Sequence, residues 1–133
     1  MGGRAPGKTT GKMVKVMNED GSNWNKIPYN DRGCGCGGSM RSACIGLAYY
    51  DNTEKLIALS IESGRMTHHN PLGFLGSMVS SYFTSLGIKG IHPNKWASYL
   101  FEEGFPISEK YVKNAGREVK QNFDNGHWEK FVQ

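Results

Sequence analysis

The sequence predicts an all-α domain, and three observations lead to that expectation. Apolar residues recur three and four positions apart in several segments, helix-capping residues precede those segments, and no stretch alternates as a strand would. The chain has 133 residues, of which 38% are hydrophobic and 21% are charged. This length and composition fit one folded domain and exclude a disordered chain.

Neither a membrane-spanning segment nor a secretory signal is visible in the sequence. No run approaches about 18 apolar residues, and no apolar segment follows Met1. The three cysteines cannot all pair within one chain, so a reducing compartment is favoured. We therefore expect a cytoplasmic protein that has no membrane partner.

The first half of the chain is expected to contain three helices and one long irregular stretch. A short helix is predicted over residues 12–17, and residues 24–38 show no periodicity. Ser39 is expected to cap a helix with apolar positions Met40, Ala43, Cys44, Leu47 and Ala48. Thr53 is expected to cap a helix with Leu56, Leu59 and Ser60 on one side and Ile57 and Ile61 close by.

The second half begins with the clearest helix signal of the chain. Asn70 is a capping residue and Pro71 follows it at the first helical position. The stripe that continues to about Gly87 consists of Leu72, Leu75, Val79, Tyr82, Phe83 and Leu86. A further helix is expected over residues 95–102, ending before Gly104-Phe105-Pro106. The last helix is expected from about Ser108, with Tyr111, Ala115, Val119 and Phe123 on one face.

Charge and glycine content point to an anionic ligand without requiring one. Sixteen Lys and Arg against twelve Asp and Glu give a net charge of +4. Ordinary solvated surface charge explains this value, so a nucleic-acid partner is not required. Glycine is the outlier, because 18 residues are about twice the average usage. The glycines cluster in residues 2–11 and 33–38.

Residues 2–9 match the phosphate-binding pattern G-x-x-x-x-G-K-[ST], and Asp51 could follow as a metal-binding acid. The mechanism needs a buried strand that leads into the loop. Only Met1 precedes Gly2, so the match is interpreted as a coincidence of composition. The competing hypothesis of a nucleotide-binding loop predicts that Lys8→Ala abolishes ATP binding.

Cysteines and histidines suggest a second alternative, a structural zinc site. Cys34-Gly35-Cys36 and His68-His69 have the usual ligand types, but the spacing misses the common pattern and adjacent histidines point apart. No bound zinc is expected. Cys44 lies on the predicted apolar face and is expected to be a small core residue.

The segment from Gly35 to Arg41 is more informative, because a glycine-rich loop opens directly onto a predicted helix. Exposed backbone N–H groups and the helix dipole would form an anion site there, and a flexible loop before a helix cap is the alternative. Residues 62–71 concentrate polar side chains between two apolar helices. A histidine there could donate to a phosphate or a ribose hydroxyl, or could instead cap the preceding helix.

Taken together, these strings resemble the ADP-ribosylglycohydrolase family. The matching segments are Gly3-Arg4-Ala5-Pro6-Gly7, Trp24-Asn25-Lys26-Ile27-Pro28-Tyr29, Gly35-Cys36-Gly37-Gly38-Ser39-Met40-Arg41, Cys44-Ile45-Gly46-Leu47, Glu62-Ser63-Gly64-Arg65-Met66-Thr67-His68-His69 and Pro71-Leu72-Gly73. Their order and spacing are similar to the ADP-ribosylarginine hydrolase branch. The resemblance implies an all-α helical bundle with long glycine-rich substrate loops. It also implies hydrolysis of the N-glycosidic bond between ADP-ribose and a protein arginine.

The resemblance also implies an ADP-ribose site. Two glycine loops would hold the diphosphate and the adenosine ribose, an aromatic residue would stack near the adenine, and His68 would lie close to the diphosphate and its ribose. The residues that carry these expectations are Gly3, Arg4, Ala5, Pro6, Gly7, Tyr29, Gly35, Cys36, Gly37, Gly38, Ser39, Met40 and His68. The expected partners are ADP-ribose and proteins carrying ADP-ribosylated arginine, and we expect a monomer.

The chain departs from the family pattern in its acidic residues. Members bind two magnesium ions through a Ser/Thr-Asp-Asp-Thr motif and an Asp-x-Asp-Ser/Thr motif, but neither Asp-Asp nor Asp-x-Asp occurs here. Glu102 and Glu103 are adjacent and fit a solvated helix face better than a catalytic pair. Asn70 stands where a third histidine is usual, and Cys34 adds a thiol beside the loop.

Residues 1–133 are therefore expected to be the central part of one ADP-ribosylglycohydrolase domain. Magnesium is expected for the full domain but has no ligands in this chain, and the catalytic residues stay unassigned. Cleavage through an oxocarbenium-like transition state needs charge stabilisation and an activated water. We expect the isolated chain to be inactive. The alternative is a non-catalytic ADP-ribose-binding module or a pseudoenzyme.

Overall fold

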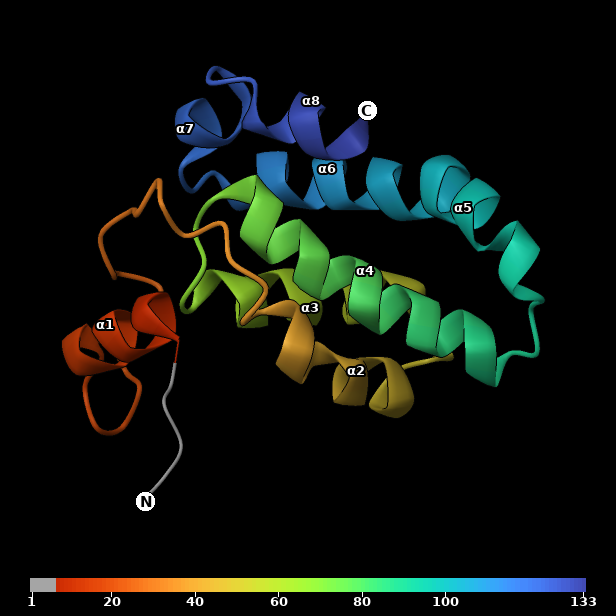
Figure 1. Ribbon diagram of the computed structural model, residues 1–133, viewed down its shortest axis with the longest axis horizontal. Helices are drawn as coiled ribbons and strands as arrows, with labels where there is room; N and C mark the ends of the chain where they lie inside the picture. The colour runs from red at the N-terminus through yellow and green to blue at the C-terminus, as the bar shows by residue number, and fades with distance from the viewer. Residues whose placement is uncertain (1–6) are drawn as a thin grey trace.

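Figure 1 shows the computed structural model, which describes residues 7–133. Every regular element in this range is helical, which confirms the predicted all-α class. In chain order the elements are α1 (Lys8–Val16), α2 (Ser39–Ala48), α3 (Thr53–Arg65), α4 (Pro71–Ile88), a 3₁₀ turn (Pro93–Lys95), α5 (Trp96–Tyr99), a π-helical turn (Leu100–Gly104), α6 (Phe105–Ala115), α7 (Val119–Phe123) and α8 (His127–Val132). Among these helices, none combines the length and apolar character needed to cross a bilayer.

Helix α4 is the centre of the fold and begins as predicted. The Oδ1 atom of Asn70 accepts a hydrogen bond from the amide of Leu72 at 3.0 Å, and Pro71 is the first helical residue. The helix packs against both α2 and α3. Because neighbours surround it, burial extends beyond the predicted stripe to Phe74 and Met78, which are fully buried.

Large apolar side chains from both halves of the chain form one core on the α3 side of α4. Helices α6 and α8 close this core, and Figure 1 shows both of them above α4. The buried members are Leu56, Ile57, Ile61, Phe74, Leu75, Met78, Tyr82, Leu86, Leu100, Phe105, Val112 and Trp128. Burial of this apolar surface is the main source of stability.

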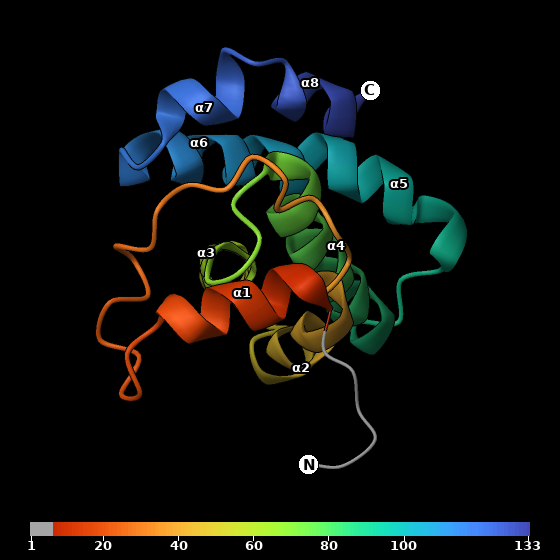
Figure 2. The ribbon, with the colours of Figure 1, turned by 60° about the vertical axis from the view of Figure 1, so that its left-hand side comes forward.

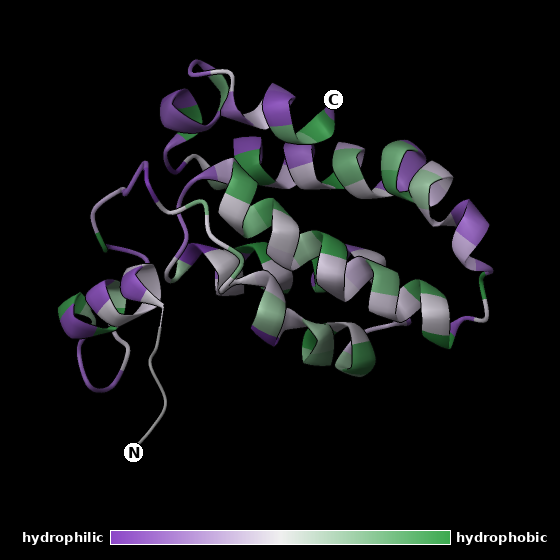
Figure 3. Ribbon diagram, viewed as in Figure 1, coloured by the Kyte–Doolittle hydropathy of each residue, from purple (hydrophilic) through white to green (hydrophobic). Residues whose placement is uncertain are grey.

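Helix α2 turns the opposite face inward from the one its apolar pattern predicts. Met40 and Leu47 are 80% and 59% exposed and Cys44 is also exposed, so the expectation that Cys44 is a core residue is wrong. Ser42 and Gly46 are buried instead. The physical reason is that α2 lies too close to α4 for larger side chains. Figure 3 shows apolar residues along the turns of α2.

Several helix starts differ from the predicted ones by a residue or more. Gly38, not Ser39, precedes α2, and Ser39 is already helical with no capping side chain. Asn52 rather than Thr53 caps α3, because its Oδ1 accepts a hydrogen bond from the amide of Lys55 at 3.0 Å. Helix α1 begins at Lys8, four residues earlier than expected.

The predicted break at Gly104-Phe105-Pro106 is absent, because α5 continues through the π-helical turn into α6. At this turn the amide of Phe105 donates to the carbonyl of Leu100, five residues back. This wider turn accommodates Pro106, which has no amide hydrogen and whose ring would crowd a regular α-helix.

The prediction of a single helix that extends as far as Phe123 is also wrong. Helix α6 ends at Ala115 because the next residue, Gly116, has a φ of +67°, and α7 and α8 fold back over α6 (Figure 1). The buried Arg65 fixes this turn by donating to the carbonyl of Arg117 at 2.8 Å. The helix therefore stops at this turn, which the buried Arg65 holds in place, instead of continuing to Phe123 as predicted.

Candidate functional site

The glycine loop, residues 33–38, lies directly against the histidine turn, residues 66–70, which joins α3 to α4. A Cβ atom on Gly33 would come within 2.8 Å of the amide nitrogen of His69. A Cβ atom on Gly73 would come within 2.3 Å of the Gly33 carbonyl oxygen. Only glycine permits this approach, so these residues bring the two segments together.

The glycine loop ends at the N-terminus of α2 with backbone amides that have no hydrogen-bond acceptor among residues 7–133. The amide of Met40 donates to the carbonyl of Cys36 at 3.0 Å, and that of Arg41 donates to Gly38 at 3.3 Å. Within residues 7–133, the amides of Gly37, Gly38 and Ser39 donate to no backbone carbonyl. Free amides at the positive end of a ten-residue helix can bind an anion.

His68 lies beneath this loop and is 2% exposed. A Cβ atom on Gly37 would lie 2.8 Å from the ring carbon Cε1 of His68, so the ring and the loop backbone are in close contact. Burial, and secondarily the charge of Arg41, lower the pKa of His68 from its ordinary value. The structure therefore brings Gly35 and Gly37 together with His68, whose imidazole ring is neutral.

His69 is buried beside Tyr29. Its ring centroid lies 6.1 Å from that of Tyr29, and its Nδ1 atom is buried without a hydrogen-bond partner. Burial lowers the pKa of His69 to about 4, and the positive charges of Arg65 and Arg117 act in the same direction. His69 is therefore neutral at physiological pH.

Tyr29 sits between the histidine turn and α1. Its hydroxyl group is buried, and this burial together with the nearby charge of Asp31 raises its pKa to about 12. The ring borders a cavity of about 200 Å³ that also touches Lys12, Met13 and Val16 of α1. Stacking of Tyr29 near an adenine stays a prediction.

The remaining predicted site residues fall into two groups. Gly3, Arg4, Ala5 and Pro6 lie outside the described residues, whereas Gly7 is exposed immediately before α1. Cys36 and Met40 are exposed at the rim of the glycine loop. Helix α1 is near that loop, because a Cβ atom on Gly37 would lie 3.1 Å from the hydroxyl oxygen of Thr10; Figure 2 shows α1 beside the start of α2.

Two residues of the site were not among the predicted ones, Arg41 and Thr67. Arg41 donates to the carbonyl of Gly37 at 3.1 Å, to the carbonyl of Ser63, and to the Thr67 hydroxyl oxygen at 2.8 Å. Arg41 and Thr67 both lie inside the segments that resemble the family. No rule of sequence spacing predicts a contact between two residues that are 26 positions apart. Their roles follow only from the packing of α2 against the end of α3.

A buried ion network supports the histidine turn from the other side. Arg117 pairs with Glu62, and Arg65 lies 3.7 Å from Glu62 and 3.6 Å from Glu118. The hydroxyl of Tyr111 donates to Glu62 at 3.0 Å. The ion pairs of these two arginines and two glutamates anchor the turn after α6.

Comparison with known proteins identifies the family of this chain. The family model described as ADP-ribosylglycohydrolase matches residues 2–128. This chain belongs to the ADP-ribosylglycohydrolase family. It is 44% identical over 132 residues to ADP-ribosylhydrolase ARH1 of Dictyostelium discoideum. This match covers 94% of the chain and 34% of that protein.

A second relative of this family member is viral. The chain is 36% identical over 138 residues to protein L444 of Acanthamoeba polyphaga mimivirus, whose name contains the term ADP-ribosyl glycohydrolase. That match covers 97% of the chain and 26% of the viral protein. The chain thus spans about a third and about a quarter of the lengths of these two curated relatives.

The described part of this family member does not fit a metal site. Within residues 7–133, no three His, Cys, Asp or Glu side chains are grouped so as to hold a metal ion. The three cysteines are all free and exposed.

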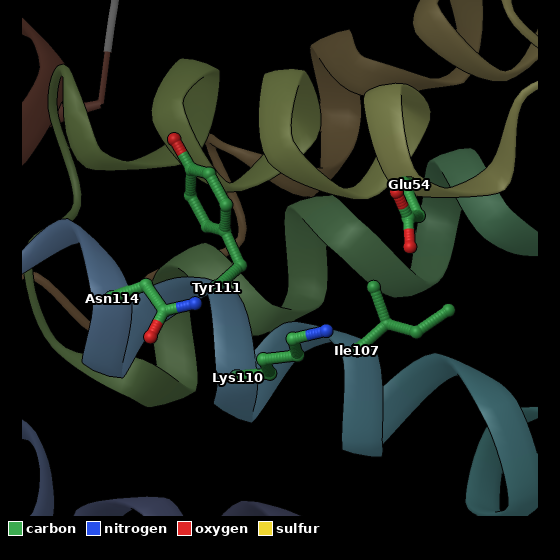
Figure 4. Close-up of a pocket in the computed structure, with 5 residues that line it drawn as sticks. All are labelled: Glu54, Ile107, Lys110, Tyr111 and Asn114. Atoms are coloured by element: carbon green, nitrogen blue, oxygen red, sulfur yellow. The ribbon is translucent and has the colours of Figure 1, made fainter.

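Two other hollows of this ADP-ribosylglycohydrolase chain lie away from the glycine loop. Figure 4 shows a cleft of about 180 Å³ where Glu54 of α3 faces Ile107, Lys110, Tyr111 and Asn114 of α6. A wider apolar groove of about 640 Å³ lies between α2 and α3. Its lining residues are Trp24, Ile45, Tyr49, Leu59, Glu62, Ser63 and Met66. Neither hollow contains a residue of the predicted ADP-ribose site.

Proposed function

We propose that this chain supplies the diphosphate-holding part of the substrate site of an ADP-ribosylarginine hydrolase. The observation that carries the proposal is the set of unused amides of Gly37, Gly38 and Ser39 at the N-terminus of α2, with His68 beneath them. Family membership and the similarity to a protein named ADP-ribosylhydrolase support the choice of ligand.

The chemistry of this part suits a diphosphate. Several amides converge on one point at a helix N-terminus, where the helix dipole favours negative charge. In this proposal, Tyr29 stacks near the adenine, and residues 3–7 provide a second loop for the diphosphate and ribose. The proposal also includes a monomeric protein in the cytoplasm, where the three exposed thiols would stay reduced.

The cleavage chemistry is proposed to need residues beyond these 133. Breaking the bond to arginine requires stabilisation of an oxocarbenium-like transition state and an activated water, for which magnesium ions and a carboxylate are suited. Neither acidic motif occurs in this sequence. We therefore propose that the full family domain binds magnesium, whereas residues 1–133 alone bind ADP-ribose without hydrolysing it.

Calorimetric titration with ADP-ribose tests the binding part of the proposal. Saturable binding is expected for the chain, and Gly37→Val should weaken it at least about tenfold, because its side chain would collide with the His68 ring and displace the amides. Gly87→Ala is the control, since the added Cβ atom would meet nothing closer than 3.6 Å. No heat at millimolar ADP-ribose would contradict the proposal.

Release of ADP-ribose from modified arginine tests the catalytic part. With magnesium present, the purified chain is expected to release no more ADP-ribose than buffer alone. A rate well above buffer would show that the chain is a complete catalyst and would overturn this part. Binding without release also fits a second function, an ADP-ribose-binding module, which the lack of Asp-Asp and Asp-x-Asp within these 133 residues favours.

A further inference from the structure

The feature that the proposed function does not use is the position of Arg41. This half-buried guanidinium contacts three separate segments, namely the glycine loop through Gly37, the end of α3 through Ser63, and the histidine turn through Thr67. Among residues 7–133 it forms no ion pair with a carboxylate. All of its acceptors are neutral, so its hydrogen bonds serve to orient them.

The direction of these hydrogen bonds is determined by the chemistry of arginine. A guanidinium group only donates, so the Thr67 hydroxyl oxygen accepts the bond from Nη2 of Arg41 at 2.8 Å. The same oxygen lies 2.7 Å from Nδ1 of His68. Thr67 is 5% exposed, and its hydroxyl proton needs an acceptor.

Only one arrangement satisfies all three groups. If Nδ1 of His68 carried the proton, two donors would face the Thr67 oxygen and the hydroxyl proton would be left without an acceptor there. If Nδ1 is unprotonated, Thr67 donates to it, and each group has a partner. The neutral imidazole then carries its proton on Nε2.

That second nitrogen faces the glycine loop. A Cβ atom on Gly37 would lie 3.2 Å from Nε2 of His68, and one on Gly35 would lie 3.6 Å from it. An Nε2–H group at this place adds a donor beside the free amides of Gly37, Gly38 and Ser39. The opposite tautomer would present a lone pair there and repel a phosphate oxygen.

We infer that Arg41 and Thr67 form a hydrogen-bond relay that fixes His68 in its Nε2–H tautomer, so that the histidine presents a neutral donor to an anion in the glycine loop. Arg41 and Thr67 are positioning residues, because they act through His68. The tautomer follows from the contacts alone, and its role toward the diphosphate rests on the proposed function. Burial and the charge of Arg41, which lower the pKa of His68, agree with a neutral ring.

Long-range ¹H–¹⁵N correlation spectra of the ¹⁵N-labelled chain measure the tautomer directly. At pH 7.5 the ring of His68, assigned by its loss in His68→Asn, is expected to show an unprotonated Nδ1 and a protonated Nε2. Thr67→Ser should preserve this pattern because it retains the hydroxyl group. Thr67→Val should abolish the preference, giving a mixture or the Nδ1–H form.

Two results would overturn the inference. One is a protonated Nδ1 in the unmodified chain, and the other is an unchanged tautomer in a folded Thr67→Val variant. Thermal unfolding followed by circular dichroism shows whether each variant is folded. If Thr67→Val does not fold, the spectra of the unmodified chain and of Thr67→Ser still decide the question.

Titration with ADP-ribose and with inorganic pyrophosphate separates the relay from the proposed function. Thr67→Val is expected to weaken binding of both probes about tenfold, whereas Thr67→Ser is expected to change it less than twofold. An Nε2–H tautomer without binding of either probe would support the relay and reject the proposed function. Binding with an Nδ1–H tautomer would reject the relay and leave the proposed function standing.

Discussion

The two sides of α4 are built from different kinds of residue. The seam with α2 contains small residues, since Ser42 and Gly46 pack against Ser77 and Ser81. The Ser81 hydroxyl donates to the Ser42 carbonyl at 2.7 Å, and the Ser42 hydroxyl donates to the Ser77 carbonyl at 2.9 Å. The opposite side of α4 packs large apolar side chains against α3, α6 and α8.

The two sides of α4 therefore have different roles, one in stabilising the fold and the other in positioning the glycine loop. The apolar side buries most of the hydrophobic surface, whereas the seam contributes close approach and specific hydrogen bonds. The glycine loop lies at one end of the seam, where a Cβ atom on Gly38 would be 3.3 Å from the Gly73 carbonyl oxygen. The small-residue seam therefore sets the distance between the glycine loop and the histidine turn.

The largest expected effect comes from removing a large side chain on the apolar side. Phe74 is fully buried, and its ring centroid lies 6.5 Å from that of Trp128. Phe74→Ala should lower the free energy of unfolding by about 3–5 kcal/mol, measured by urea denaturation. The half-buried Phe83 is the control in the same helix, and an equal loss for Phe83→Ala would show that burial does not determine stability here.

The next effect concerns the histidine turn, where the two sides meet. Because burial holds the pKa of His69 at about 4, below the ordinary value of 6.5, the unfolded chain binds more protons between these values. Stability should fall as pH drops from about 6.5 toward about 4, by up to about 3 kcal/mol from this residue.

Urea denaturation at several pH values measures this dependence. His68 acts in the same direction, since its pKa is also lowered. His69→Gln should flatten the slope between pH 6.5 and 4 relative to the unmodified chain. An unchanged slope in that variant would mean that His69 is not the group that titrates.

A smaller loss is expected from filling the seam. A Cβ atom on Gly46 would lie 2.2 Å from the Ser81 carbonyl oxygen, so α2 must move away from α4. Gly46→Ala should cost about 1–3 kcal/mol by overpacking. Gly87→Ala has room for its Cβ atom and should instead stabilise α4 by up to about 1 kcal/mol; two changes of the same sign would contradict the close packing of the seam.

The smallest effect is expected on the outer face of α2. Leu47 is 59% exposed, so Leu47→Ser should change the unfolding free energy by less than about 0.5 kcal/mol. Leu56→Ser, at a fully buried position, should cost several times more. A comparable loss for Leu47→Ser would reveal that another surface covers the outer face of α2 in solution.

Local sequence signals predicted much of this fold correctly. Asn70 followed by Pro71 indicated the start of α4, because capping and the fixed φ of proline act within one turn of helix. The placement of His68 near the glycine loop was also expected. The ADP-ribose contacts of the predicted site residues stay predictions, since only their positions relative to one another are described.

Other features depend on partners far along the chain. Periodicity predicted that Cys44 and Leu47 would face inward, but the neighbour of α2 is a row of serines that admits only small side chains. Gly116 was overlooked as a helix stop because the apolar pattern continues past it. The π-helical turn before Pro106 likewise depends on the packing of two joined helices.

The sequence by itself determined that this chain is helical, where α4 begins, and to which family it is similar, because these properties reside in short strings of residues. Only the tertiary structure decided which face of α2 is buried and how Arg41, Thr67 and His68 meet. Those outcomes depend on contacts between residues up to 39 positions apart, such as Ser42 with Ser81. Hydrophobic periodicity assumes that a helix packs its apolar side against an apolar neighbour. Helix α2 instead packs closely against a side of α4 that consists of small, polar residues.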